Sequence, residues 1–447
     1  MSNEGVFLAK QNPLGRFMSS TGWQVANQIY SMALSLVVGA ITARYLGPAN
    51  YGLIGYGQSL VSLFVSFSTL GMNGVVVKEL IQNPDDRGEI IGTAFLMRLV
   101  SSIACMGMIA GLLRIIEPGN TTLYIITLLQ SFALVLRAFE AVSYWFQAKL
   151  EYKFISLASM IGYTIVCIWR IALLAKGVGV EWFSASSCVE YLVSSAVVVF
   201  CFIKRYPTKM SFKFGTAKRI FKQSYHFILS GIAISLYTQV DKVMLGSMMD
   251  AKAVGYYTAA TTIATLWEFI PMAVINSAKV LILEKKGKDE TEYTRLLSLL
   301  LFGISVMSLV VSVGLVLFGK LAIYILYGNE YMVSYAPLAI LMWSTGFAMI
   351  GSARGSTWIL AENLNRYSKY YVFISSGVNI LLNASLIPLW GMNGAAVATL
   401  VSQITTAFIA PLFFKETRRF VTLYFGSWKI GMREVKKYLK RKKKENA

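Results

Sequence analysis

Charged residues are scarce in this sequence: they make up 14% of its 447 residues, whereas 56% are hydrophobic. Because a soluble domain carries about 25% charged residues, a soluble globular protein is excluded. The chain has only four cysteines, which all lie in apolar runs and form no CxxC pair. We expect them to be buried apolar side chains, and the sequence predicts neither a metal site nor a cofactor site.

Catalytic and nucleotide-binding motifs are also missing, since the sequence contains no P-loop, no GxSxG and no HExxH. Its single histidine, His226, stands next to basic residues at the start of an apolar run and is expected to lie at the membrane surface. Transport driven by ATP within this chain is therefore excluded. No catalytic residue is expected, and the chain is not predicted to be an enzyme.

Apolar runs long enough to cross a bilayer dominate what is present. A hydrocarbon core about 30 Å thick needs about 20 apolar residues per helix. The sequence therefore predicts an all-α polytopic membrane protein with about twelve transmembrane helices. Their approximate ranges are 19–43, 52–76, 91–115, 122–145, 155–176, 183–203, 224–247, 255–278, 297–318, 336–358, 370–389 and 393–414.

Lysine and arginine set the orientation of these spans. The segment Lys204–Lys222 holds seven basic residues and no acidic one, and in all 32 of the 42 basic residues lie on the side that holds both termini. Five lie on the opposite side and five within spans. The positive-inside rule then predicts that both termini are cytoplasmic. The net charge of +20 reflects this topology, and no nucleic-acid partner is expected.

The basic segment also divides the chain. We predict an N-terminal lobe of six helices (residues 1–203), a cytoplasmic basic linker (204–223), a C-terminal lobe of six helices (224–415) and a basic cytoplasmic tail (416–447). A weak repeat relates GPANYGLIGYG in the first half to DAKAVGYYTAA in the second. It favours two pseudo-symmetric six-helix bundles around a central cavity.

Nine charged residues fall within predicted spans. Each costs about 2.5–3.5 kcal/mol at the centre of a membrane helix, so these side chains must face protein or water. The five cations are candidate contacts for an anionic substrate, because guanidinium groups pair well with phosphate. The alternative is that the charges pair with one another and hold the helices in register. The nine are Arg98, Arg137, Glu140, Arg170, Glu190, Asp241, Lys242, Glu268 and Arg354.

Three of the acidic residues, Glu140, Asp241 and Glu268, are candidate carboxylates for coupling to H⁺ or Na⁺. Arg137 and Glu140 are three residues apart, a spacing that allows an ion pair within one helix. Glu268 precedes Pro271 by three residues, at a place where a missing backbone hydrogen bond favours an opening in the helix.

Three segments resemble one known family. They are ARYLGPANYG (Ala43–Gly52), LRAFEAVSYWFQAKLEYK (Leu136–Lys153) and NILLNASLIPLWGMNGAAVA (Asn379–Ala398). They are similar to the bacterial oligosaccharide (polysaccharide repeat-unit) flippases of the multidrug, oligosaccharidyl-lipid and polysaccharide exporter superfamily. The resemblance extends from Phe17 to Lys415. Lipid II flippases of the same superfamily carry two further C-terminal helices, whereas only a basic tail is expected here.

The resemblance implies a function. Such a flippase moves an oligosaccharide on undecaprenyl diphosphate from the cytoplasmic to the outer leaflet of the bacterial plasma membrane by alternating access. Its product supplies exopolysaccharide, capsule or O-antigen synthesis, and its expected partners are the lipid-linked oligosaccharide, membrane lipids, H⁺ or Na⁺, and the polysaccharide polymerase machinery. One alternative is an ion-coupled drug or organic-cation antiporter of the same superfamily. Another is a membrane glycosyltransferase or polymerase that uses Glu330, which the short outer loops disfavour.

Overall fold

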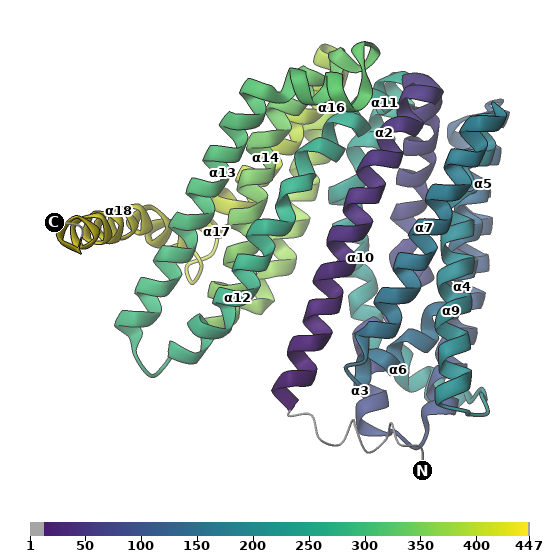
Figure 1. Ribbon diagram of the computed structural model, residues 1–447, viewed down its shortest axis with the longest axis horizontal. Coiled ribbons are helices and arrows are strands. Elements are labelled where there is room, and N and C mark those ends of the chain that lie inside the picture. The colour runs from purple at the N-terminus through teal and green to yellow at the C-terminus, as the bar shows by residue number, and fades with distance from the viewer. Residues whose placement is uncertain (1–12, 446–447) are drawn as a thin grey trace. The chain divides into compact units, whose positions relative to one another are not determined.

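A computed structural model describes residues 13–445, and every regular element in that range is a helix (Figure 1). Residues 1–12, which hold the predicted cytoplasmic N-terminus, and residues 446–447 lie outside the described part. Contacts within the chain divide it inside α10 (Phe214–Met248), into the units Met1–Ser235 and Leu236–Ala447. This division falls beyond the predicted linker, residues 204–223, because that segment packs against the first unit.

The first unit is made of long helices joined by short turns. Two of its spans include shorter elements, among them a 3₁₀ segment, η1, that continues α5 directly into α6. In chain order its elements are α2 (Pro13–Ser68), α3 (Asn73–Gln82), α4 (Arg87–Ile116), α5 (Thr121–Leu136), η1 (Arg137–Val142), α6 (Ser143–Ala148), α7 (Tyr152–Lys176), α8 (Val180–Ser184), α9 (Ser186–Arg205) and the first part of α10.

The second unit is built in the same manner and ends in a helix that is not among the candidate membrane spans, α18. Two of its short segments, η4 and η6, are π-helical. After α10 its elements are α11 (Ala251–Thr265), η2 (Leu266–Glu268), α12 (Phe269–Lys285), α13 (Glu290–Tyr327), η3 (Asn329–Ser334), α14 (Tyr335–Ala353), η4 (Arg354–Trp358), α15 (Ile359–Ala361), η5 (Asn365–Tyr367), α16 (Ser368–Ile404), η6 (Thr405–Ile409), α17 (Ala410–Leu412) and α18 (Arg419–Glu445).

Ten helical stretches of the described chain are long and apolar enough to cross a membrane. Two of these stretches each contain two predicted spans joined by a kink. In α2 the kink lies at Gly47, whose φ is 70°, followed by Pro48, and in α16 it lies at Gly391, whose φ is 55°. The backbone angles of both glycines are non-helical, so each glycine breaks the helix and turns the chain directly into the next span. Counting both stretches twice gives the twelve predicted spans, and the prediction of an all-α polytopic membrane protein is confirmed.

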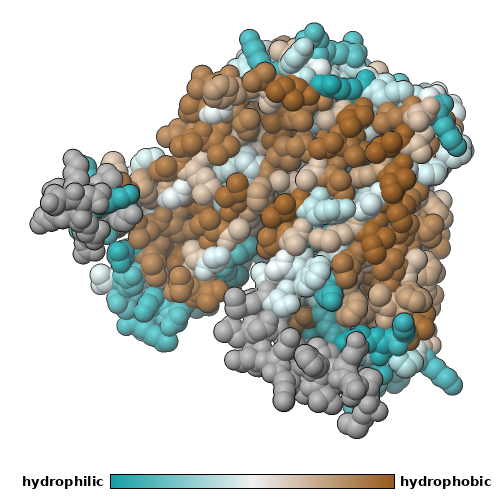
Figure 2. Space-filling model, viewed as in Figure 1, coloured by the Kyte–Doolittle hydropathy of each residue, from teal (hydrophilic) through white to brown (hydrophobic). Residues whose placement is uncertain are grey.

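The surface agrees with a membrane environment. Figure 2 shows apolar side chains covering the lengths of the helices, while hydrophilic ones gather at the helix ends. Ile115, Leu317 and Leu389 are among the large apolar residues that are strongly exposed. In water such a surface would be unfavourable, whereas against lipid it costs nothing. The chain is therefore a multi-pass membrane protein.

The two halves end one of their spans in the same way. Trp145 and Trp358 are both buried, and each is followed five residues later by a residue with a φ of 57°, Leu150 and Asn363. In both cases the next amide donates a hydrogen bond of 2.8 Å to the carbonyl five residues before it. This pairing is the Schellman arrangement of a helix C-terminus. The repeated ending is a structural sign of the predicted pseudo-symmetry.

The predicted linker crosses the start of α4 through backbone contacts. A Cβ atom on Gly92 would lie 2.5 Å from the carbonyl oxygen of Ser211, and one on Gly88 would overlap that of Lys209. The amide of Ser211 donates to the carbonyl of Gly88 at 3.3 Å. Only glycine allows the backbone to come so near at these two positions, which lie one turn apart on α4. The segment is thus fixed on the first unit.

Candidate functional site

Short irregular segments inside the spans carry half of the eight predicted site residues. Arg137 and Glu140 lie on η1, Glu268 ends η2, and Arg354 begins η4. In a 3₁₀ helix, residues three apart stand directly above one another, and π segments often occur at functional sites. Near Pro271, where an opening in the helix was expected, the structure has the tighter 3₁₀ segment η2. The irregular segments place charged side chains at positions that a straight helix would not give.

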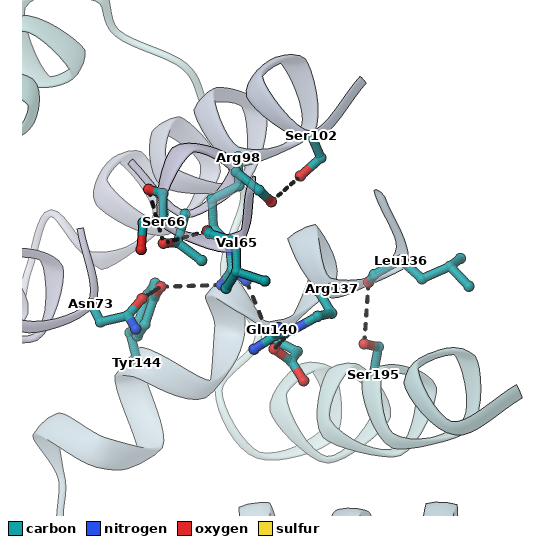
Figure 3. Close-up of polar contacts among 12 residues, drawn as sticks. Val65, Ser66, Asn73, Arg98, Ser102, Leu136, Arg137, Glu140, Tyr144 and Ser195 are labelled. Carbon is teal, nitrogen blue, oxygen red and sulfur yellow. Dashed lines mark hydrogen bonds and ion pairs between the residues drawn. The ribbon is translucent and has the colours of Figure 1, made fainter. Parts of the chain in front are cut away.

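Two arginines of the first unit meet one carboxylate (Figure 3). The Nη2 of Arg98 lies 3.7 Å from Oε2 of Glu140, and the Nε of Arg137 lies 3.5 Å from the same oxygen. The expected pair between Arg137 and Glu140 is confirmed, whereas the contribution of Arg98 from α4 was not predicted. Charge-assisted hydrogen bonds usually measure about 2.7–2.9 Å. Glu140 is therefore shared loosely between two guanidinium groups.

The two arginines differ in how firmly they are held. Arg98 is 3% exposed, and its Nη1 donates to the hydroxyl of Tyr144 at 3.1 Å; that hydroxyl donates to Oδ1 of Asn73 at 2.5 Å. Arg137 and Glu140 are each 28% exposed, and the guanidinium of Arg137 lies 4.9 Å from the ring centre of Tyr191. The site thus combines a fixed, buried arginine with an accessible Arg–Glu pair.

Arg170 lies on α7 and forms a second polar group of the first unit. Its Nε donates to Oγ of Ser186 at 3.1 Å, and Glu190 on α9 lies within its electrostatic reach. With Arg98, Arg137 and Glu140, these residues give the first unit three arginines and two glutamates inside its spans. The intramembrane charge of this unit is therefore positive even if both glutamates are ionised.

Asp241 is the centre of a buried polar network in the second unit. Its Oδ1 accepts from Nδ2 of Asn383 at 2.7 Å, and its Oδ2 accepts from the hydroxyl of Tyr257 at 2.9 Å and from that of Thr399. Asn383 also donates to Oδ1 of Asn379 at 3.0 Å. Asp241 is buried, and within residues 13–445 no lysine or arginine forms an ion pair with it. The carboxylate is surrounded by neutral oxygen and amide groups.

Two further atoms of this network lack partners. Oδ1 of Asn383 and Nδ2 of Asn379 are buried and have no hydrogen-bond partner in the described part of the chain. Buried polar atoms are usually satisfied, so exceptions need an explanation. One of these atoms is an acceptor and the other a donor, so the network can take up a further polar partner.

Arg354 joins two π segments rather than an acidic partner. Its Nη1 donates to the carbonyl oxygens of Thr406 and Ala407 on η6, the latter at 3.0 Å. The guanidinium also lies 4.5 Å from the ring centre of Tyr371 and 5.7 Å from that of Phe420. Arg354 is 3% exposed. Its contacts hold η4, η6, α16 and α18 together and leave little room for a ligand.

Among the residues that the structure describes, Lys242 and Glu268 form no hydrogen bond or ion pair with the polar groups described above. Lys242 is partly buried and follows Asp241, but the Asp241 network described above does not include its amine. Glu268 is partly buried on η2, beside Trp267, whose indole donates to Thr345 at 3.1 Å. Among the predicted site residues, the structure gathers Arg98, Arg137 and Glu140 in one cluster. It places Arg170, Asp241 and Arg354 in three others.

Sequence reasoning missed the neutral partners of these charges. Tyr144 and Asn73 orient Arg98, while Asn379, Asn383 and Thr399 surround Asp241. One signal was present, because Asn379 and Asn383 are four residues apart in an otherwise apolar run and therefore share a helix face. Paired asparagines on one face of a membrane helix indicate a polar partner.

Comparison with known proteins agrees with this architecture. Residues 41–336 match the family model described as polysaccharide biosynthesis protein. The chain belongs to this family. "Probable flippase AglR" of Haloferax volcanii is 24% identical over 83% of this chain and 79% of its own length. "Putative O-antigen transporter" of Escherichia coli K12 is 23% identical over 87% of this chain and 94% of its own length. The resemblance to oligosaccharide flippases is thus confirmed.

Solved structures show the same fold for this polysaccharide biosynthesis protein. A structure titled lipid II flippase MurJ, inward closed conformation, matches with a TM-score of 0.68 and 16% identity, over 92% of this chain and 90% of that one. An inward-facing multidrug resistance MATE family transporter of the MOP superfamily matches with a TM-score of 0.65 and 14% identity, over 88% and 96%. At these identities the likeness shows the fold alone.

Proposed function

We propose that the chain is a flippase for undecaprenyl-diphosphate-linked oligosaccharide repeat units. It moves them from the cytoplasmic to the outer leaflet by alternating access, for exopolysaccharide, capsule or O-antigen synthesis. The family membership, the flippase and transporter names of two relatives and the shared fold support this proposal. The step is translocation, with no bond made or broken in the substrate.

The cluster of Arg98, Arg137 and Glu140 carries the proposal. A diphosphate needs cationic donors, and here two guanidinium groups, the part-exposed one of Arg137 and the buried one of Arg98, converge on one carboxylate oxygen at 3.5 and 3.7 Å. Glu140 occupies the position that a phosphate oxygen would take. The substrate diphosphate displaces Glu140, so that Arg98 and Arg137 exchange a weak internal partner for two stronger charged hydrogen bonds. Arg170 and Lys242 are further candidate contacts for the diphosphate or for acidic sugars.

Arg354 is a weaker candidate for the same role. Its guanidinium already donates to two backbone carbonyls and is buried against two aromatic rings. We propose that it acts mainly by fixing the two π segments, so its effect on substrate binding is indirect.

Asp241 is the coupling carboxylate in this proposal. Oxygen ligands from a carboxylate, an amide and a hydroxyl suit either Na⁺ or a proton, and irregular membrane helices supply such sites in transporters. Its buried network contains the carboxylate, the hydroxyls of Tyr257 and Thr399, and the unpaired amide oxygen of Asn383, whose amide nitrogen donates to Asp241. Glu140 and Glu268 are secondary candidates, because both are partly exposed on irregular segments.

The proposed location is the bacterial plasma membrane, with both termini in the cytoplasm. The distribution of 32 basic residues on one side and five on the other supports this orientation. The partners are then membrane lipids, the lipid-linked oligosaccharide, H⁺ or Na⁺, and the polymerase machinery that uses the translocated repeat unit. Neither a nucleic acid nor a cofactor has a part in the proposal.

Export in cells tests this function. Neutralising Arg137, Arg170 and Lys242 one at a time should reduce surface polysaccharide at unchanged protein level, most strongly for Arg137. Normal export by every variant would contradict the cationic site. Efflux of a cationic dye by the purified protein in vesicles, without movement of any lipid-linked oligosaccharide, would instead favour the antiporter.

A further inference from the structure

Helix α18 packs one of its faces on α13. The ring of Trp428 lies 5.3 Å from that of Phe302, edge to face, and Glu434 forms an ion pair of 3.3 Å with Arg295. A Cβ atom on Gly431 would overlap the ring of Phe302, so the two helices approach closely here. These contacts fix the rotation of α18 about its own axis. In Figure 1 the helix extends away from α13 toward the C-terminus.

The fixed rotation leaves an apolar strip uncovered. Phe425, Met432 and Val435 are 63%, 49% and 47% exposed. Phe425 and Met432 are seven residues apart and therefore share a face, and Val435 lies one turn beyond Met432. These side chains border the α13-facing side of the helix. A charged residue would be expected at such positions if α18 stood in water.

Basic residues occupy the neighbouring face. Lys429, Arg433 and Lys436 are all exposed, and at 100° per residue they lie within about 60° of one another, beside Met432. Residues 429–444 include nine lysines and arginines and one acidic residue, Glu434. Glu434 is itself paired with Arg295 and Lys437. The described surface of α18 is therefore apolar on one strip and strongly cationic on the next.

We propose that α18 lies in the headgroup region of an anionic cytoplasmic leaflet. A bilayer with acidic lipids has an anionic headgroup layer directly above its apolar acyl region. These two layers match the cationic strip and the apolar strip of α18. Phe425, Met432 and Val435 enter the acyl region, while the lysines and arginines contact the headgroups. The proposal rests on the cytoplasmic orientation of the C-terminus and does not depend on the identity of the transported substrate.

Lipid contact at α18 also reaches the Arg354 group. Phe420, in the first turn of α18, lies 5.3 Å from the ring of Trp358 and next to the guanidinium of Arg354. Tyr424 lies 4.8 Å from the ring of Phe408 on η6. An anionic leaflet that holds α18 therefore also stabilises η4 and η6. We therefore expect the full chain to have a higher melting temperature in anionic bilayers than in neutral bilayers.

Hydrogen exchange on the full-length protein tests the proposal. The protein is placed in nanodiscs of phosphatidylcholine alone or with about one third phosphatidylglycerol. Amides of residues 429–445 should exchange more slowly in the anionic nanodiscs, and high salt should reduce the difference. Each basic residue near an anionic surface contributes about 1 kcal/mol, so the protection should fall about fivefold for each basic residue removed. The test variant is Lys429→Gln/Arg433→Gln/Lys436→Gln.

A matched variant removes three exposed basic residues from the predicted opposite side, Arg114→Gln/Lys252→Gln/Lys320→Gln, and should keep the protection. Met432→Ser/Val435→Ser should also lose it, because the apolar strip then no longer enters the acyl region. Equal exchange in neutral and anionic nanodiscs would overturn the proposal. Protection that appears in native membranes but not in anionic nanodiscs would overturn it as well, and would assign the strip to a protein partner.

Discussion

The substitution Arg137→Gln should weaken substrate binding without changing the stability of the fold. Arg137 is 28% exposed, and its pair with Glu140 at 3.5 Å is loose. A part-exposed ion pair contributes only about 0–1 kcal/mol to stability, so the variant should fold normally. A hydrogen bond to a charged group is worth about 1.5–3 kcal/mol, and its loss should raise the KM for a diphosphate-linked oligosaccharide about 10- to 150-fold.

Arg98→Gln is the matched comparison, since the same chemical change occurs in a buried position. Arg98 is 3% exposed and donates to Tyr144, so its loss removes a buried hydrogen bond, while Glu140 keeps Arg137 and the Tyr144 hydroxyl keeps Asn73. Loss of a buried hydrogen-bond partner costs about 1–3 kcal/mol, so a lower melting temperature than that of Arg137→Gln is expected.

The assay is transport of lipid-linked oligosaccharide in proteoliposomes at several substrate concentrations, with thermal unfolding in detergent measured on the same preparations. Arg137→Lys keeps the charge but loses the planar fork, so its KM should lie between those of the wild type and Arg137→Gln. An unchanged KM for Arg137→Gln, with normal folding, would refute the role of the cluster in binding the diphosphate.

Three further changes test other parts of the structure. Asp241→Asn should abolish the response of transport to an imposed Na⁺ or H⁺ gradient, and a gradient response equal to that of the wild type would exclude Asp241 as the coupling group. Gly92→Leu should destabilise the protein by about 1–3 kcal/mol because the new side chain meets the linker backbone. Gly107→Leu should not, because a side chain at that position points into open space, and equal melting temperatures of the two variants would argue against the close approach at Gly92. Arg354→Met should lower the melting temperature by leaving two carbonyls of η6 unpaired, at about 1–3 kcal/mol, while transport per folded molecule should change little; the opposite pattern would make Arg354 a substrate contact.

The number of spans was predictable because hydropathy alone sets it. Twelve apolar runs appear as ten helical stretches only because Gly47 and Gly391 join neighbouring spans without a loop. The pair formed by Arg137 and Glu140 was also predictable, since a spacing of three brings both side chains to one face. Local spacing thus gave the elements and one ion pair of the site.

The remaining site contacts depend on tertiary packing. Arg98 reaches Glu140 from another helix, and Asn383 reaches Asp241 across 142 residues of sequence. Arg354 donates hydrogen bonds to backbone carbonyls of the π segment η6, and no residue pattern in the sequence predicts that segment. The packing of the linker on α4 was not predicted, because its contacts with Gly88 and Gly92 are made largely by backbone atoms, which leave no trace in side-chain composition.

The most direct test of the proposed function is the leaflet position of an undecaprenyl-diphosphate-linked oligosaccharide in proteoliposomes that contain this protein. A sugar-specific reagent outside the vesicles measures exposure, with and without an imposed Na⁺ or H⁺ gradient, and protein-free vesicles serve as the control. The proposed function predicts protein-dependent exposure on the far leaflet, faster with one of the gradients. Exposure no greater than in protein-free vesicles, for several candidate glycans, would contradict it.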